Sequence, residues 1–170
     1  MKTLLCIAGI SVTDKRKENS LFTKEYCLAA QCIVVKADSA IKGKADLAGK
    51  TVSVGDVGSG TEFNAAQIFE AYGMTFDDIN KQSLGFTDSA DKFKDGQLDA
   101  FFTVAGAPTT NIAELATSND FVILSIGDEQ LKYLQENYAY YTPYTLPANT
   151  YAKQTEDVTT VTVKATLIVN

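Results

Sequence analysis

The pattern of apolar and polar positions divides the chain into short strands that alternate with helices. Val52 and Val54 flank a polar residue and lead to Gly55, which predicts a strand that ends in a turn. Beyond that turn the apolar residues recur with helical spacing, at Ala65, Ile68, Phe69 and Tyr72. The same criteria predict further strands at residues 32–35, 82–86, 98–104, 121–126 and 159–169, and further helical segments at 42–47, 87–94, 108–116 and 128–137. This alternation favours an α/β fold with a mostly parallel sheet and helices on both faces.

The turn between the strand at Val54 and the helix that follows is rich in glycine. Ser59 and Glu62 have the spacing of a capping box, in which the serine accepts from the backbone and the glutamate reaches back. A glycine turn and a capped helix together present free N–H groups and the positive end of a helix dipole, which favours a bound anion. The spacing is not that of a dinucleotide fingerprint or a P-loop, because no lysine follows the last glycine. An ordinary strand-to-helix turn is the alternative.

A second junction of this kind is expected at residues 105–109, after the apolar strand 98–104. In an open α/β sheet both junctions lie at the carboxyl ends of strands, where ligands bind. Neither residues 51–80 nor residues 95–131 contain lysine or arginine. An anion bound there would be held by backbone N–H groups and hydroxyls, which favours a carboxylate over a polyphosphate.

The composition excludes several classes of function. The 170 residues suit one domain, and 45% of them are hydrophobic, enough to bury a core. The net charge of −6 disfavours nucleic acid and anionic membranes as partners. The chain has no histidine, which removes histidine-dependent catalysis and the usual zinc sites. Ser59 has no base to activate it, so we expect no catalytic residue, no metal and no cofactor.

Two features near the N-terminus allow more than one interpretation. The cysteines are Cys6, Cys27 and Cys32, and either a Cys27–Cys32 bridge or free buried thiols would suit their spacing. The apolar run at residues 4–10 resembles the start of a secretory signal, but it suits a buried strand equally well.

Several motifs resemble bacterial solute-binding proteins. Residues 37–55 are similar to the segment near the hinge of such proteins. Four further runs resemble the TAXI family, the binding proteins of TRAP-type transporters: residues 58–65 (GSGTEFNA), 94–102 (KDGQLDAFF), 105–109 (AGAPT) and 140–151, which contains YYT and LPANTY. The resemblance extends from about residue 21 to residue 169.

This resemblance implies a fold of two α/β lobes joined by hinge strands, with a ligand closed between them. Residues 21–170 correspond to the second lobe of a type 2 periplasmic-binding-protein fold, with hinge strands near 33–35 and 161–169, so that the family's pattern is truncated here. Residues 1–20 are atypical and are expected to form a strand or a signal remnant. We also expect the run at 4–10 to pair with the hinge strands, within the chain or by exchange with a second copy.

The resemblance also implies a function and a set of site residues. Family members bind glutamate, glutamine or related carboxylates, in the periplasm or at the outer side of the membrane, and dock on TRAP-type transporter subunits. The residues expected to bind the ligand are Ser59, Gly60, Thr61, Asn64, Ala105, Gly106, Thr109 and Tyr141. The alternative is a stand-alone interaction or structural module without a transport role, which forms a homodimer through an exposed hinge surface.

Overall fold

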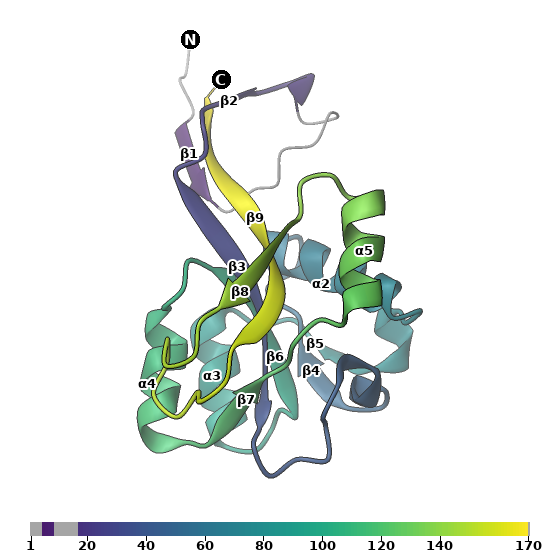
Figure 1. Cartoon of the computed structure of the whole chain (residues 1–170), viewed down its shortest axis with the longest axis vertical. Coiled ribbons are helices and arrows are strands. Elements are labelled where there is room, and N and C mark those ends of the chain that lie inside the picture. The colour runs from purple at the N-terminus through teal and green to yellow at the C-terminus, as the bar shows by residue number, and fades with distance from the viewer. Residues whose placement is uncertain (1–4, 9–16, 170) are drawn as a thin grey trace.

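The computed structural model describes the backbone of residues 5–8 and 17–169, and the side chains of residues 17–166 (Figure 1). The α-helices are α2 (Gly60–Ala71), α3 (Phe86–Lys94), α4 (Thr110–Ser118) and α5 (Asp128–Asn137), and the short 3-10 helices are η1 (Lys44–Leu47) and η2 (Phe76–Asp78). The strands are β1 (Leu5–Ala8), β2 (Leu21–Phe22), β3 (Cys27–Lys36), β4 (Thr51–Ser53), β5 (Asn80–Gln82), β6 (Ala100–Ala105), β7 (Phe121–Ile123), β8 (Thr142–Leu146) and β9 (Val158–Val169).

The strands form a mixed sheet whose main path has the order β1-β9-β3-β6-β4-β5. The α/β class predicted from the sequence is confirmed. Parallel pairing is found between β4 and its neighbours β5 and β6, whereas the long strands β3 and β9 pair with their neighbours antiparallel. The connection from β3 to β4 contains only the short helix η1, so the chain turns back at the same end of the sheet and β4 runs opposite to β3.

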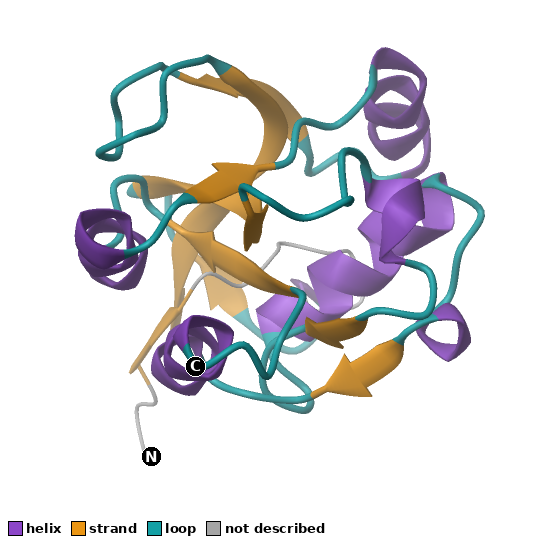
Figure 2. Ribbon diagram, turned by 90° about the horizontal axis from the view of Figure 1, so that it is seen from below, coloured by secondary structure: helices purple, strands orange, loops and turns teal. Residues whose placement is uncertain are grey.

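Helices cover both faces of the sheet, as the sequence predicts (Figure 2). On one face, α2 and α5 pack on a core that includes Ile33, Phe102 and Val161. On the other face, α3 and α4 pack on a core that includes Val34 and Phe101. Neighbouring residues of β3 and β6 thus contribute to opposite cores, which is why most residues of both strands are buried.

The strands β3 and β9 pair beyond the end of β6, toward the top of Figure 1. Their contact runs from the pair Cys27 and Ala165 to the pair Ala30 and Thr162. Of the two predicted hinge segments, residues 33–35 pair with β6 and β7, and residues 161–169 belong to β9.

The N-terminal strand β1 pairs antiparallel with the last residues of β9, and β2 pairs with β9 as well. Pairing of the run at residues 4–10 within the chain is thereby confirmed for Leu5–Ala8, while its other members lie outside the described residues. In the part of the chain that the structure describes, no helix is long and apolar enough to cross a membrane.

Two helices begin at other residues than predicted. The helical segment predicted at residues 87–94 begins one residue earlier, at Phe86, and its N-cap is Gly85. Pro108 was expected in the first turn of α4, but the N-cap is Thr109 and the helix begins one residue later. Both starts follow from backbone conformation: Gly85 and Thr109 are extended, so helical geometry begins only after them.

Candidate functional site

The candidate site is formed by three junctions at the carboxyl ends of β4, β5 and β6. These parallel strands end at the same edge of the sheet, and each leads into a helix. Ala105 at the end of β6 lies opposite Ala30 of β3, so this edge is the one beyond which β3 continues in its pairing with β9. A Cβ atom at Gly85 would stand 3.3 Å from Oδ2 of Asp56, which places the β4–α2 turn beside the start of α3. The predicted gathering of junctions at one edge is therefore found.

Gly55 allows the turn after β4 to pack closely on the first turn of α2. Its φ is +93°, in the region that favours glycine. A Cβ atom at this position would stand 2.6 Å from the Cβ of Thr61. Thr61 is buried, and as the second residue of α2 it has a backbone N–H group with no acceptor within the helix.

Ser59 is the N-cap of α2, and its Oγ accepts a hydrogen bond from the N–H of Glu62 at 3.1 Å. This half of the predicted capping box is confirmed. The other half is different, because the Glu62 carboxylate accepts from the N–H of Gly58, at 2.7 Å, instead of from the N-cap residue. Gly60 and Thr61 are the first two residues of the helix, so their N–H groups have no acceptor within it.

A lysine does reach this junction, although none occurs in the local sequence. Lys81 of β5 forms an ion pair with Glu62. Lys81, followed by the N–H of Gly58, holds the pKa of the Glu62 carboxyl below its usual range. This pair could not be predicted from the sequence, because the two residues belong to different elements. The parallel pairing of β4 with β5 brings them together.

The second junction offers fewer donors than the sequence suggested. The N–H of Thr109 donates to the hydroxyl of Tyr151 at 3.0 Å, and the Thr109 hydroxyl lies 3.4 Å from the same oxygen. Ala105 and Gly106 are half-buried. A Cβ atom at Gly106 would stand 3.1 Å from the Sγ of Cys27, so this turn packs directly on the start of β3.

Asn64 and Tyr141 lie together in the core beneath α2. The Tyr141 hydroxyl is 3.0 Å from Oδ1 of Asn64 and 2.7 Å from Oε1 of Gln67. Gln67 in turn donates to the hydroxyl of Tyr140. Burial raises the pKa of Tyr141 far above its usual value. Both predicted residues therefore anchor α2 to the segment before β8, and Gln67 and Tyr140 are network members that the sequence did not reveal.

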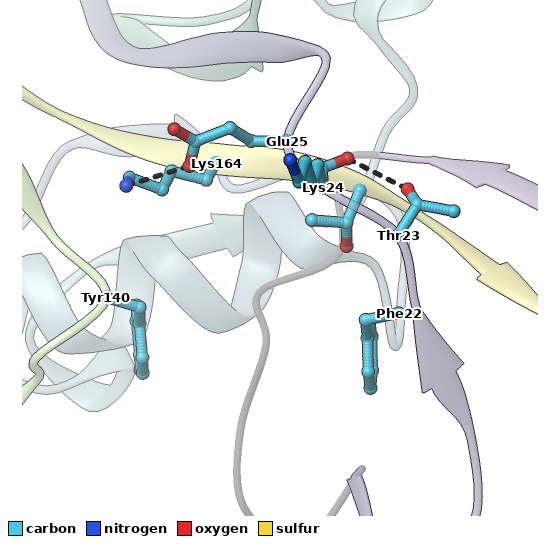
Figure 3. Close-up of a pocket in the computed structure, with 7 residues that line it drawn as sticks. Phe22, Thr23, Lys24, Glu25, Tyr140 and Lys164 are labelled. Atoms are coloured by element: carbon cyan, nitrogen blue, oxygen red, sulfur yellow. Dashed lines mark hydrogen bonds and ion pairs between the residues drawn. The ribbon is translucent and has the colours of Figure 1, made fainter.

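A cavity of about 450 Å³ lies beside β2 and β9, near the predicted hinge (Figure 3). We call it the hinge cavity. Its described lining comes from β2, β9, the link between β2 and β3, and the segment before β8, and consists of Phe22, Thr23, Lys24, Glu25, Tyr140, Lys164 and Thr166. Most of this lining could not be predicted from the sequence, because a strand of two residues is too short to show an alternating pattern.

The fold is that of periplasmic binding proteins. The structure is similar to the holo form of the arginine-binding protein ArgBP from T. maritima, with a TM-score of 0.52 and 23% identity, over 94% of this chain and 55% of that chain. It is also similar to the substrate-binding protein of an amino acid ABC transporter, with a TM-score of 0.54 and 23% identity, over 94% of this chain and 56% of that chain.

A sequence relative is the arginine-binding extracellular protein ArtP of Bacillus subtilis (strain 168). The two are 34% identical over 96 residues, which are 56% of this chain and 36% of ArtP. The chain thus spans little more than half the length of the solved structures that it resembles, and the matched part of ArtP is shorter still.

The family model of the NMT1-like family matches residues 25–170, and the chain belongs to this family. The match includes every residue of the candidate site. It begins just before β3, so β1 and β2 precede the matched region.

Proposed function

We propose that the chain is the ligand-binding lobe of a bacterial solute-binding protein, and that it holds a small carboxylate or amino acid, such as glutamate or glutamine, at the N-terminus of α2. The observation that carries this proposal is the pair of N–H groups at Gly60 and Thr61, which have no acceptor within the helix and stand at the edge beyond which β3 continues in its pairing with β9. Ser59 and Glu62 fix the turn but leave these two donors to a solute.

Asn64 and Tyr141 act beneath the site by holding the helix, and Ala105, Gly106 and Thr109 form its second wall. The names of the relatives, which include arginine-binding proteins, support an amino acid as the solute. Following the motifs at residues 58–65 and 105–109, we assign the transporter partner to the TRAP type and the protein to the periplasm or the outer side of the membrane. The proposal includes no catalytic step.

The test is a calorimetric screen of amino acids and dicarboxylates, first on the chain itself and then on Gly60→Pro. Proline is tolerated at the first position of a helix, and the extended Ser59 suits the residue before a proline, so this change removes one N–H group with little other effect. Asp128→Pro, at the first position of α5, is the matched control. We expect a solute whose affinity falls at least about tenfold in Gly60→Pro and not in the control. If no compound binds, or if both variants bind equally well, the proposal is wrong.

A second function is favoured by one observation. Of the exposed large apolar side chains, five belong to the hinge segments and to the β4–α2 junction: Leu21, Tyr26, Leu28, Val57 and Phe63. Exposed apolar residues that gather at one end are typical of an interaction surface, and an interaction module that forms a homodimer through this end would use them. Gel filtration over a range of concentrations distinguishes the two functions, because a monomer at all concentrations would contradict the module.

A further inference from the structure

The hinge cavity has the size and lining of a small-molecule site. Its volume of about 450 Å³ falls within the usual range for ligand pockets. Figure 3 shows the rings of Phe22 and Tyr140 on opposite sides, with Lys24, Glu25 and Lys164 lying between them along one wall. Rings and the aliphatic stems of lysines make most of such a lining apolar.

The charges around the cavity favour an anion. Glu25 and Lys164 form an ion pair at 2.8 Å, so their charges largely cancel. Lys24 adds a second positive charge to the same lining. The described part of the lining therefore carries one net positive charge, although the whole chain carries a net charge of −6. A charged ligand would have to be negative to be attracted here.

The cavity is distinct from the N-terminus of α2, because its described lining shares no residue with that junction. The two are nevertheless linked. Tyr140 lines the cavity with its ring, while its hydroxyl accepts a hydrogen bond from Gln67 in the middle of α2. Tyr140 is therefore held in place by the helix, and one wall of the cavity is preorganised.

We propose that the hinge cavity binds a small organic anion with an apolar, ring-bearing body, at a site separate from the N-terminus of α2. The ring of the ligand packs between Phe22 and Tyr140, and its carboxylate or sulfonate meets Lys24. Because β2, β9 and the link between β2 and β3 all contribute to the described lining, such a ligand also connects these segments.

The test uses 3-phenylpropionate and two matched compounds. One is 3-phenylpropylammonium, which has the same body with the opposite charge, and the other is propionate, which has the same charge without the ring. Binding to the chain is measured by titration calorimetry or ligand-observed NMR. We expect 3-phenylpropionate to bind at least about tenfold more tightly than either matched compound. Equal binding of the ammonium compound, or no binding of 3-phenylpropionate, would overturn the proposal.

Variants then locate the ligand. Lys24→Gln is expected to weaken 3-phenylpropionate binding about tenfold, whereas Lys132→Gln, an exposed lysine of α5, is expected to leave it unchanged. Phe22→Ala is compared with Leu21→Ala, its exposed neighbour on β2, which lies outside the described lining. Lys24 is exposed, so its variant tests the site even if Phe22→Ala disturbs β2. If Lys24→Gln and Lys132→Gln bind equally, or if Gly60→Pro abolishes binding, a separate hinge site is excluded.

Discussion

The carboxylate of Glu62 accepts a hydrogen bond from the backbone N–H of Gly58 at a distance of 2.7 Å. A side chain of α2 thus closes the glycine turn that precedes the helix. Lys81 of β5 reaches the same carboxylate and connects the turn to the neighbouring strand. The helix N-terminus at which we place the solute is therefore held by its own sequence and by the adjacent strand.

Glu62→Ala is expected to lower the free energy of unfolding by about 1–2 kcal/mol at neutral pH, because it removes a charge-assisted hydrogen bond and an ion pair. Since the pKa of Glu62 is lowered in the folded chain, this contribution is present above the usual carboxyl pKa and is lost as the pH falls through the folded value. Urea titrations at several pH values measure it. Lys81→Met, which removes the ion pair and the contact of the Lys81 ammonium with the Phe76 ring but keeps the Gly58 bond, should cost less, and a larger cost would show that the Gly58 bond contributes little.

Tyr141→Phe is expected to destabilise the chain by about 1–3 kcal/mol, because it removes the hydroxyl that lies between two buried amide oxygens, those of Asn64 and Gln67. Tyr133→Phe is the matched control, since the Tyr133 hydroxyl bonds Glu70 on the exposed surface. Thermal unfolding of both variants measures the difference. Equal loss in the two variants would mean that the network beneath α2 does not hold the helix.

Lys44 gives the stability of the chain a dependence on pH. Its ammonium group is buried beside Cys32, the carbonyl of Leu124 and the ring of Tyr72, and burial lowers its pKa from 10.5 to about 7. From about pH 7 upward the unfolded chain holds a proton that the folded chain has lost, so the free energy of unfolding rises with pH. Above pH 9.0 Cys32 acts in the opposite direction, because burial raises its pKa to about 12.

Denaturant titrations between neutral pH and about pH 9 measure this slope. We expect Lys44→Met to flatten it and Lys132→Met, which changes an exposed lysine, to leave it as it is. A slope that survives in Lys44→Met would show that another group is responsible.

The two cysteines whose side chains are described should differ in reactivity. Both are free thiols, but Cys27 is partly exposed, whereas Cys32 is buried and its pKa is raised to about 12. At neutral pH the thiolate fraction of Cys32 is therefore about a thousandfold lower than that of a thiol with the ordinary pKa of 9.0. Brief treatment of the folded chain with N-ethylmaleimide, followed by peptide mass spectrometry, should find Cys27 modified and Cys32 intact. Modification of both at similar rates would contradict the burial of Cys32.

The fold class could be predicted because local pattern and global arrangement agree in this chain. The alternation in residues 159–169 and the apolar run in β6 identify strands, since period and burial are properties of the sequence itself. Strand direction could not be derived in the same way. It depends on whether a connection crosses the sheet or turns back, and the turn between β3 and β4 gives no sign of this in its sequence.

The parts of the candidate site that a single segment forms could be predicted from the sequence, and the parts that several segments form could not. Ser59 and Gly60 belong to one turn, so their role as N-cap and first helical residue follows from their spacing. Tyr141 and Asn64 are far apart in the sequence, and only the folded chain shows that they meet in the core rather than at the surface. The same holds for Lys81, which reaches the glycine turn from β5.

The central claim is that the N–H groups of Gly60 and Thr61 hold the carboxylate of a solute. The most direct measurement is an amide ¹⁵N NMR titration of the chain with glutamate, glutamine and arginine in turn. The account predicts that at least one of these moves the Gly60 and Thr61 signals in a saturable way, and by more than signals elsewhere in the chain. It is contradicted if none of the three moves these two signals, or if the largest changes arise at the hinge cavity.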